Sequence, residues 1–349
     1  MNEKKKDTED KIVLLSHGAG GALQEKLIRF ITKSAKLRKI GNGIGLDAYD
    51  DGATIPLTEK DSEIVITSDG HTIDPIFFPG GNLGELAATG TINDLLMMGA
   101  KPIAISSTIF IEEGFSFDQL EKITTSFHET LKDNNVALLC GDTKVLPKGN
   151  LDKIIMSTTG IGLKKDTLKI LDSNIKIGDK IIITGYIGDH GSSLIANRKE
   201  INIDTTLLSD LHVLSPIIKS IPNLQDINAM KDPTRGGVSA ALNNWAQKSN
   251  VSIFLYEEKL PIRKEVKAIC EILGLNPLDI SNEGKALISV DRDHADQVLN
   301  AIRSTELGQF AEIIGEVREE NQGKVLMKTK FGGTRFINMP MGEPIPRVC

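Results

Sequence analysis

The sequence predicts an α/β protein of two domains followed by a C-terminal tail. Its 349 residues are enough to build two hydrophobic cores. Strand-like apolar runs alternate with helix-like stretches, as in α/β layers. This pattern occurs in the first half and restarts near residue 172, which favours two related halves. We expect a disordered tail at 1–10, an N-terminal domain at 11–170, a C-terminal domain at 171–335 and a mobile tail at 336–349.

The composition excludes several classes of protein. A net charge of −6, 4% aromatic residues and the lack of a basic stripe argue against binding to nucleic acid. No apolar run approaches the roughly 18 residues of a membrane helix, and the charged first ten residues do not resemble a signal peptide. Cys140, Cys270 and Cys349 are too far apart for a disulfide framework or a metal-binding pair. We expect a cytoplasmic protein with no nucleic-acid or membrane partner.

The first half contains acidic residues near the ends of predicted strands. We expect strands at 11–15, 64–67, 103–111 and 136–140, and helices at 23–34, 83–98 and 117–131. Asp51, Asp69 and Asp142 lie in glycine-containing segments next to these strands. Such carboxylates suit Mg²⁺, which prefers oxygen ligands, although Asp and Gly are also common in ordinary turns.

Asp94 stands out in the helix predicted at 83–98. Leu83, Leu86, Ala87 and Met97 share one face of this helix, and Asp94 falls within the same apolar arc. A buried carboxylate is costly unless it is paired with a cation. Asp94 is therefore a candidate metal ligand, with a structural ion pair as the alternative.

The second half repeats the order of strand, glycine-rich loop and helix. We expect a strand at 180–185 that leads to a loop at 188–191, and a helix that follows the double glycine at 236–237 with a buried stripe of Val238, Ala241, Leu242 and Trp245. A helix that begins at a double glycine offers amides for an anion. Further along we expect helices at 264–273 and 294–303, a strand at 286–290, and strands around Val325 and Phe336.

The C-terminal tail ends in a cysteine. Pro340, Pro344 and Pro346 prevent a helix and favour an extended chain before Cys349. Prenylation is excluded because its signal needs three residues after the cysteine. The tail is either a frayed end or a device that carries a thiol into a cleft or to a partner.

Six blocks taken together resemble the HypE family of nickel–iron hydrogenase maturation factors. They are FFPGG at 77–81, GDTK at 141–144, GDHG at 188–191, DPTRGG at 232–237, NEGK at 282–285 and PRVC at 346–349. The family is related to aminoimidazole ribonucleotide synthetase, selenophosphate synthetase and thiamin-phosphate kinase. The resemblance implies a two-domain aminoimidazole ribonucleotide synthetase-like fold, with an N-terminal domain that binds ATP and forms a homodimer.

The resemblance also implies an activity, two cofactors and several partners. A HypF-type carbamoyltransferase would load a carbamoyl group onto Cys349. An ATP- and Mg²⁺-dependent dehydratase activity would then convert the thiocarboxamide into a thiocyanate. The cyano group would pass to iron held by a HypC–HypD scaffold.

Residue roles follow from the matching positions. For metal, the resemblance implies Asp51, Asp69, Asp94 and Asp142. For the nucleotide, it implies Gly80, Gly81, Asn93, Asp94, Asp142, Thr234, Arg235, Gly236 and Gly237. For catalysis, it implies Cys349 as the carrier, Glu283 as the base and Lys144 as the cation at the carboxamide oxygen, with His190 as a second candidate base. Asn82 stands where the family often has Asp, so we leave it out of the metal site.

Two other functions remain open at this point. Another ATP-using enzyme of the superfamily, such as a selenophosphate synthetase or a small-molecule kinase, would share the acidic loops but would have no use for Cys349. A non-catalytic carrier would need Cys349 but would not need Lys144 or Glu283.

Overall fold

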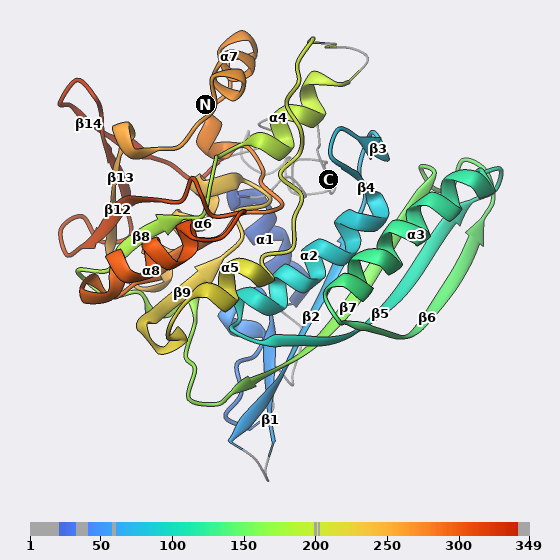
Figure 1. Cartoon of the computed structure of the whole chain (residues 1–349), viewed down its shortest axis with the longest axis horizontal. Coiled ribbons are helices and arrows are strands. Elements are labelled where there is room, and N and C mark those ends of the chain that lie inside the picture. Colours follow the sequence, from blue (N-terminus) through green and yellow to red (C-terminus); the bar gives the residue numbers. More distant parts are fainter. Residues whose placement is uncertain (1–20, 33–40, 58–60, 199–200, 202, 341–349) are drawn as a thin grey trace, which may run out of the picture.

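A computed structural model describes residues 21–32, 41–57, 61–198, 201 and 203–340. The two predicted α/β units lie side by side, each built on its own sheet (Figure 1). No helix among these residues is long and apolar enough to cross a membrane.

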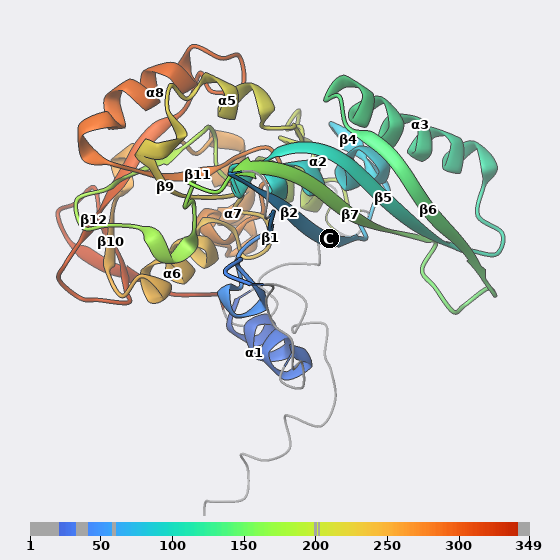
Figure 2. The ribbon, with the colours of Figure 1, turned by 90° about the horizontal axis from the view of Figure 1, so that it is seen from below.

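The first unit is a curved five-stranded sheet with two helices on one face. The strands follow the order β1 (Ala53–Pro56), β2 (Ser62–His71), β7 (Ile154–Lys165), β5 (Lys101–Glu112) and β6 (Ala137–Leu146). All neighbours are antiparallel except β5 and β6, which run parallel. Helices α2 (Leu83–Met97) and α3 (Phe117–Asp133) cover one face, and no described helix covers the opposite face of β5, β6 and β7 (Figure 2).

The second unit is a seven-stranded sheet surrounded by helices. Its strands follow the order β14 (Thr334–Ile337), β13 (Val325–Lys328), β10 (Ser252–Tyr256), β12 (Glu312–Arg318), β8 (Lys180–Ile183), β11 (Leu287–Val290) and β9 (Ile227–Lys231). The α-helices are α4 (Asp189–Ala196), α5 (Ser215–Ser220), α6 (Gly237–Lys248), α7 (Lys264–Leu273) and α8 (Ala295–Arg303). Outside the two sheets lie α1 (Gly21–Thr32) and a small hairpin of β3 (Phe77–Phe78) and β4 (Gly81–Asn82). Single 3-10 turns are η2 (Leu46–Ala48), η3 (Asp172–Asn174), η4 (Leu224–Asp226), η5 (Glu257–Lys259), η6 (Pro277–Asp279) and η7 (Arg292–His294).

Most predicted elements are confirmed within one to three residues at each end. The stripe of Val238, Ala241, Leu242 and Trp245 on α6 is buried as expected. Strand β7 was not predicted; it pairs with both β2 and β5 in the middle of the first sheet. The strand predicted at 11–15 lies outside the described residues.

The segment GDTK at 141–144 was predicted to be a loop after a strand, and this is wrong. Strand β6 continues to Leu146 because its backbone pairs with β5 as far as Glu112. Gly141 permits this pairing, since a Cβ atom there would overlap the carbonyl oxygen of Ser107. The prediction failed because pairing with a distant strand outweighs the local turn preference of Gly and Asp.

Helix α2 does not have the single apolar face that we predicted. Thirteen of its fifteen residues are buried, and the exceptions are Glu85 and Asp94. The helix is buried all round because it packs against the first sheet, against α3, and against β9 and α5 of the second unit. Asp94 therefore lies on a helix that is enclosed between the two units.

Candidate active site

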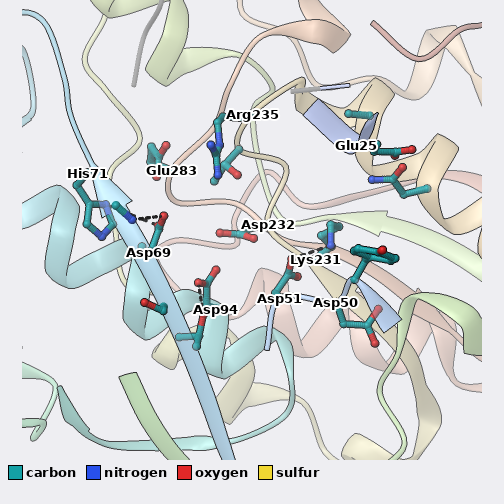
Figure 3. Close-up of a pocket in the computed structure, with 18 of the residues that line it drawn as sticks. Glu25, Asp50, Asp51, Asp69, His71, Asp94, Lys231, Asp232, Arg235 and Glu283 are labelled. Atoms are coloured by element: carbon teal, nitrogen blue, oxygen red, sulfur yellow. Dashed lines mark hydrogen bonds and ion pairs between the residues drawn. The ribbon is translucent and has the colours of Figure 1, made fainter. Parts of the chain in front are cut away.

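A cavity of about 740 Å³ lies between the two units. Its lining comes from α1, the segment around Asp51, β2, α2, the loop after β9, α6 and Glu283. Figure 3 shows the charged side chains arranged around this space. Since both units contribute lining residues, the cavity depends on how they pack together.

Four aspartates gather on one side of the cavity. Asp51, Asp69, Asp94 and Asp232 lie around a common space (Figure 3). Burial, followed by the negative charges of Asp232, Asp69 and Asp51, raises the pKa of Asp94 well above its usual value. Burial and the charge of Asp51 raise the pKa of Asp232 to about 7. A cation would relieve this repulsion.

The chemistry of these aspartates fits Mg²⁺ bound together with phosphates. No group of three or more carboxylate, imidazole or thiol side chains in the described part of the chain forms a ready-made metal cage. Mg²⁺ usually takes one or two carboxylates and fills its remaining positions with water and substrate phosphates. Thr67 Oγ1 donates to Asp94 Oδ2 at 2.8 Å, which fixes one of the candidate ligands.

Two lysines close one end of the cavity and connect the units. Lys231 Nζ lies 2.7 Å from Asp51 Oδ1 and 3.2 Å from Asp172 Oδ2. Lys248 Nζ lies 2.7 Å from Asp172 Oδ2 and 3.1 Å from Asp50 Oδ1. These ion pairs hold the segment of Asp50 and Asp51 against the second unit.

Glu283 faces the cavity from the opposite side. Burial is the main cause that raises the pKa of its carboxyl group well above the usual value, and the charges of Asp232, Asp210 and Asp69 add to the effect. Arg235, which also lines the cavity, lowers the pKa of Glu283. A carboxylate with a raised pKa is a better proton acceptor near neutral pH.

Asn93, a predicted nucleotide contact, is held by main-chain groups in the structure. The side chain is fully buried and does not line the cavity. Asn93 Nδ2 donates to the carbonyl oxygens of His212 and Glu283 at 3.1 and 3.2 Å. Asn93 Oδ1 accepts from the Leu214 N–H at 2.9 Å. Both polar atoms of the Asn93 side chain therefore form hydrogen bonds with main-chain groups.

The glycines that were expected at phosphate groups serve close packing in the structure. A Cβ atom on Gly80 would press on the Ser209 backbone, and one on Gly237 would meet the carbonyl oxygens of Leu278 and Ile280. Gly80 and Gly237 also have positive φ angles of 97° and 60°. None of Gly80, Gly81, Gly236 and Gly237 lines the cavity, whereas the predicted Thr234 and Arg235 do.

His190 lies away from the cavity. Its Nδ1 is 2.8 Å from Ser209 Oγ, and its ring forms a T-shaped pair with the ring of Phe78, with the ring centres 5.6 Å apart. Burial lowers the pKa of His190 to about 4. The structure therefore does not support His190 as a base at the cavity of this chain.

Asp142 and Lys144 lie on the exposed edge strand β6 and do not line the cavity. Lys144 Nζ is 3.4 Å from Asp142 Oδ2. The Thr143 N–H and Lys144 lower the pKa of Asp142.

Cys349 lies outside the described residues. Of the predicted side chains, the structure thus gathers Asp51, Asp69, Asp94, Thr234, Arg235 and Glu283.

Several residues of the cavity were not among the candidates from the sequence. Asp232 begins the DPTRGG block, yet we considered that block only for its later residues. Lys231 directly precedes it, and Lys248 lies at the end of α6. Arg29 of α1 also lines the cavity and lies 5.6 Å from the ring centre of Tyr49. Isolated charged residues such as these carry no sequence signal of their own.

Comparisons with known proteins point to one family. Residues 49–164 match the model described as AIR synthase related protein, N-terminal domain, and residues 176–328 match the model of the C-terminal domain. The chain is 47% identical to a hydrogenase expression/formation protein of Methanocaldococcus jannaschii, over 95% of this chain and 98% of that protein. It is 36% identical to the carbamoyl dehydratase HypE of Escherichia coli, over 97% of this chain and 99% of that protein.

Solved structures give the same result. The structure of a HypE–HypF complex contains a chain that is 38% identical, with a TM-score of 0.82 over 92% of this chain and 100% of that chain. A HypE in complex with ATP is 34% identical, with a TM-score of 0.79 over 97% of this chain and 100% of that chain. A thiamine monophosphate kinase from Aquifex aeolicus is 18% identical with a TM-score of 0.62, and this likeness shows a shared fold.

Proposed function

Because this chain belongs to the HypE family of AIR synthase related proteins, we propose that it is an ATP-dependent carbamoyl dehydratase that acts on its own Cys349. The observation that carries the proposal is the cavity between the units, where Glu283 faces a cluster of aspartates. Such a cavity can hold Mg-ATP next to a proton acceptor. A non-catalytic carrier would need neither group.

The aspartates would hold Mg²⁺ on the nucleotide phosphates. Asp51, Asp69, Asp94 and Asp232 supply the oxygen donors, and Arg235 supplies a positive charge for a phosphate. The metal would neutralise the phosphates and support transfer of the terminal phosphoryl group.

The proposed chemistry removes one water from the carbamoyl group. The amide oxygen attacks the terminal phosphorus of ATP, ADP leaves, and one N–H proton is lost to Glu283, which gives an imidate phosphate. The C–O bond then breaks with loss of phosphate and of the second N–H proton, and a thiocyanate remains. The phosphate is needed because an amide oxygen alone is a poor leaving group.

The base of the tail lies at the cavity. Pro340 is the last described residue, and its carbonyl group packs against Gly21, which lines the cavity. A Cβ atom on Gly21 would overlap that carbonyl oxygen. The nine residues from 341 to 349 would span about 28 Å if extended at roughly 3.1 Å per residue. This length allows Cys349 to reach the aspartate cluster.

Intact-mass analysis tests the proposed function. We expect the chain to gain the mass of one carbamoyl group from a HypF-type carbamoyltransferase, and then to lose the mass of one water when Mg-ATP is added. Removing Mg²⁺ with excess chelator should leave the carbamoyl mass in place. A chain that keeps its carbamoyl mass in the presence of Mg-ATP would support the carrier function instead.

The cyano group of the product thiocyanate would pass to iron on a HypC–HypD scaffold.

We further propose that two copies of the chain form a homodimer through β6. Every residue of this edge strand except the last, Leu146, is exposed. The exposed residues include the apolar Leu139 and Val145, which are 67% and 68% exposed. A long apolar edge strand invites pairing with another strand, and two-fold symmetry is the commonest closed arrangement. Asp142 and Lys144, which lie on β6 and do not line the cavity of the single chain, would then belong to this interface.

Light scattering tests the homodimer. Wild type should have the mass of two 37.9 kDa chains at micromolar concentration. Val145→Lys should give one chain, because it places a charge on the apolar edge. Ile272→Lys is the matched control, since Ile272 on α7 is also 68% exposed, and this variant should stay dimeric. A monomeric wild type, or a dimeric Val145→Lys variant, would contradict the β6 interface.

A further inference from the structure

We propose that Asn93 and Asp210 are positioning residues that hold the main chain of Glu283, Asn93 from the first unit and Asp210 from the second. This inference rests on the proposed function, in which Glu283 is the base. It assigns a role to two buried side chains that lie behind the cavity and do not line it.

Both polar groups of the Glu283 main chain are held by side chains. Asn93 Nδ2 donates to the Glu283 carbonyl oxygen at 3.2 Å. Asp210 Oδ1 accepts from the Glu283 N–H at 3.0 Å. Asn93 belongs to α2 of the first unit, whereas Asp210 belongs to the segment between α4 and α5 of the second. The two contacts fix Glu283 relative to both units.

The two holding side chains are themselves fixed. Asn93 Oδ1 accepts from Leu214 N–H at 2.9 Å, in the same segment that carries Asp210. Asp210 Oδ2 lies 3.3 Å from Lys285 Nζ, and Lys285 also donates to the Gly284 carbonyl oxygen at 3.1 Å. A Cβ atom on Gly284 would overlap the Asp210 carbonyl oxygen. The loop of Glu283 is therefore interlocked with this segment.

This arrangement couples the base to the candidate metal site. Asn93 directly precedes Asp94, which lies in the aspartate cluster. One turn of α2 thus holds the main chain of the base and presents a candidate metal ligand. Because Asp210 holds the Glu283 N–H from the second unit, α2 cannot move relative to that unit without straining one of the two contacts, so the spacing between Glu283 and the candidate metal ligand Asp94 is fixed. Preserving that distance matters because misplacement by about 1 Å can cost about 100-fold in rate.

Asp210 also contributes charge at Glu283. The charged groups that act on Glu283 are Asp232 and Arg235 from the loop after β9, Asp69 from β2, and Asp210. Lys285 and the nearby His212 face Asp210. After burial and Asp232, the Asp210 carboxylate is the next cause of the raised pKa of Glu283. Removing the charge of Asp210 should lower that pKa.

Two variants of Asp210 separate holding from charge. Asp210→Asn keeps an oxygen acceptor for the Glu283 N–H but removes the charge. Asp210→Ala removes both. Asp179→Asn is the matched control: Asp179 is a buried carboxylate of the same unit that accepts from Asn228 and Ser289 at 2.9 and 2.7 Å, and it does not line the cavity.

The readout is the rate at which the carbamoylated protein loses water after Mg-ATP is added, measured by intact mass in a single turnover at several pH values. A base works in its deprotonated form, so the rate should rise with pH through the pKa of Glu283. Asp210→Asn should move this rise toward lower pH. Asp210→Ala should be about 100-fold slower. Asp179→Asn should keep the wild-type pH dependence. This change weakens buried hydrogen bonds of the second unit, but Asp179 does not contact Glu283.

Asn93→Ala tests the other contact. Since Asn93 does not line the cavity, calorimetry should give wild-type affinity for Mg-ATP, while dehydration slows. Equal losses in affinity and rate would make Asn93 a nucleotide contact and overturn its positioning role. Wild-type rates for both Asp210→Ala and Asn93→Ala would overturn the whole proposal.

A second measurement separates this inference from the proposed function. Carbon NMR of glutamate-labelled protein can follow the Glu283 carboxyl group without carbamoyl donor or ATP, with the signal assigned from its loss in Glu283→Gln. The titration midpoint of Glu283 should be lower in Asp210→Asn than in wild type. If wild type fails to dehydrate, the proposed function is wrong, whereas an unchanged midpoint contradicts the charge effect of Asp210.

Discussion

Replacing Cys349 by alanine should prevent formation of the carbamoyl adduct and leave ATP turnover at background, even with the carbamoyl donor present. In the proposed function this thiol carries the carbamoyl group, so the dehydratase would have no substrate without it. Cys270 cannot substitute, because it is buried and burial raises the pKa of its thiol to about 11. Intact mass and phosphate release measure the two effects.

Cys140 provides the control for this experiment. It is exposed on β6 of the single chain, so its thiol is the other candidate acceptor of a carbamoyl group wherever the proposed homodimer does not cover it. Cys140→Ser should gain the carbamoyl mass and lose water like wild type. If the Cys349→Ala chain still gains a carbamoyl group, and does so through Cys140, then the tail is not the carrier and the proposed function loses its basis.

Replacing Glu283 by glutamine should produce a chain that accepts the carbamoyl group and then stalls. The change preserves the size of the side chain but removes the proton acceptor, and loss of a general base typically costs about 10²- to 10⁴-fold. Because the pKa of Glu283 is raised, the wild-type rate should increase with pH above the usual range of a glutamate, and the residual rate of the variant should lack this increase. The mass of the carbamoylated chain in the presence of Mg-ATP is the readout.

Glu85→Gln is the matched control for Glu283→Gln. Burial also raises the pKa of Glu85, but this side chain does not line the cavity. It should dehydrate its tail at the wild-type rate. If Glu283→Gln did so as well, Glu283 would not be the base, and His71, which lines the cavity, would be the next candidate in place of His190. Lys144→Ala should stall like Glu283→Gln if the homodimer brings the lysine of the partner subunit to the carboxamide.

The fold could be predicted where local patterns and tertiary packing agree. Helix α6 combines a glycine start with an apolar stripe, and both features are local. The extension of β6 through GDTK could not be predicted, because it depends on hydrogen bonds with β5, more than thirty residues earlier in the chain. The burial of helix α2 could not be predicted for the same reason. Its apolar pattern suggested one buried face, but elements of both units pack around the helix, so its other face is buried as well.

The site could be predicted in part, from residues whose chemistry is visible in the sequence. Asp94 was noticed because a carboxylate is costly on an apolar helix, and it does line the cavity. Its neighbour Asn93 carries no such signal, since an amide can pair with ligand or backbone equally well. Its partners, the Glu283 and Leu214 backbone, are at least 121 residues away, so its bridging role follows from the packing of the two units.

In the proposed function, the contact between Pro340 and Gly21 would make the carbamoyl group a tethered substrate. Pro340 lies at the cavity wall, so the group to be dehydrated would be confined within the length of the nine residues that follow. A short flexible tether gives an effective concentration of about millimolar, whatever the concentration of the protein. The rate of dehydration would then depend on the supply of nucleotide and on how often Cys349 reaches the cavity. Dilution of the enzyme would not slow it as long as the subunits of the proposed homodimer stay together.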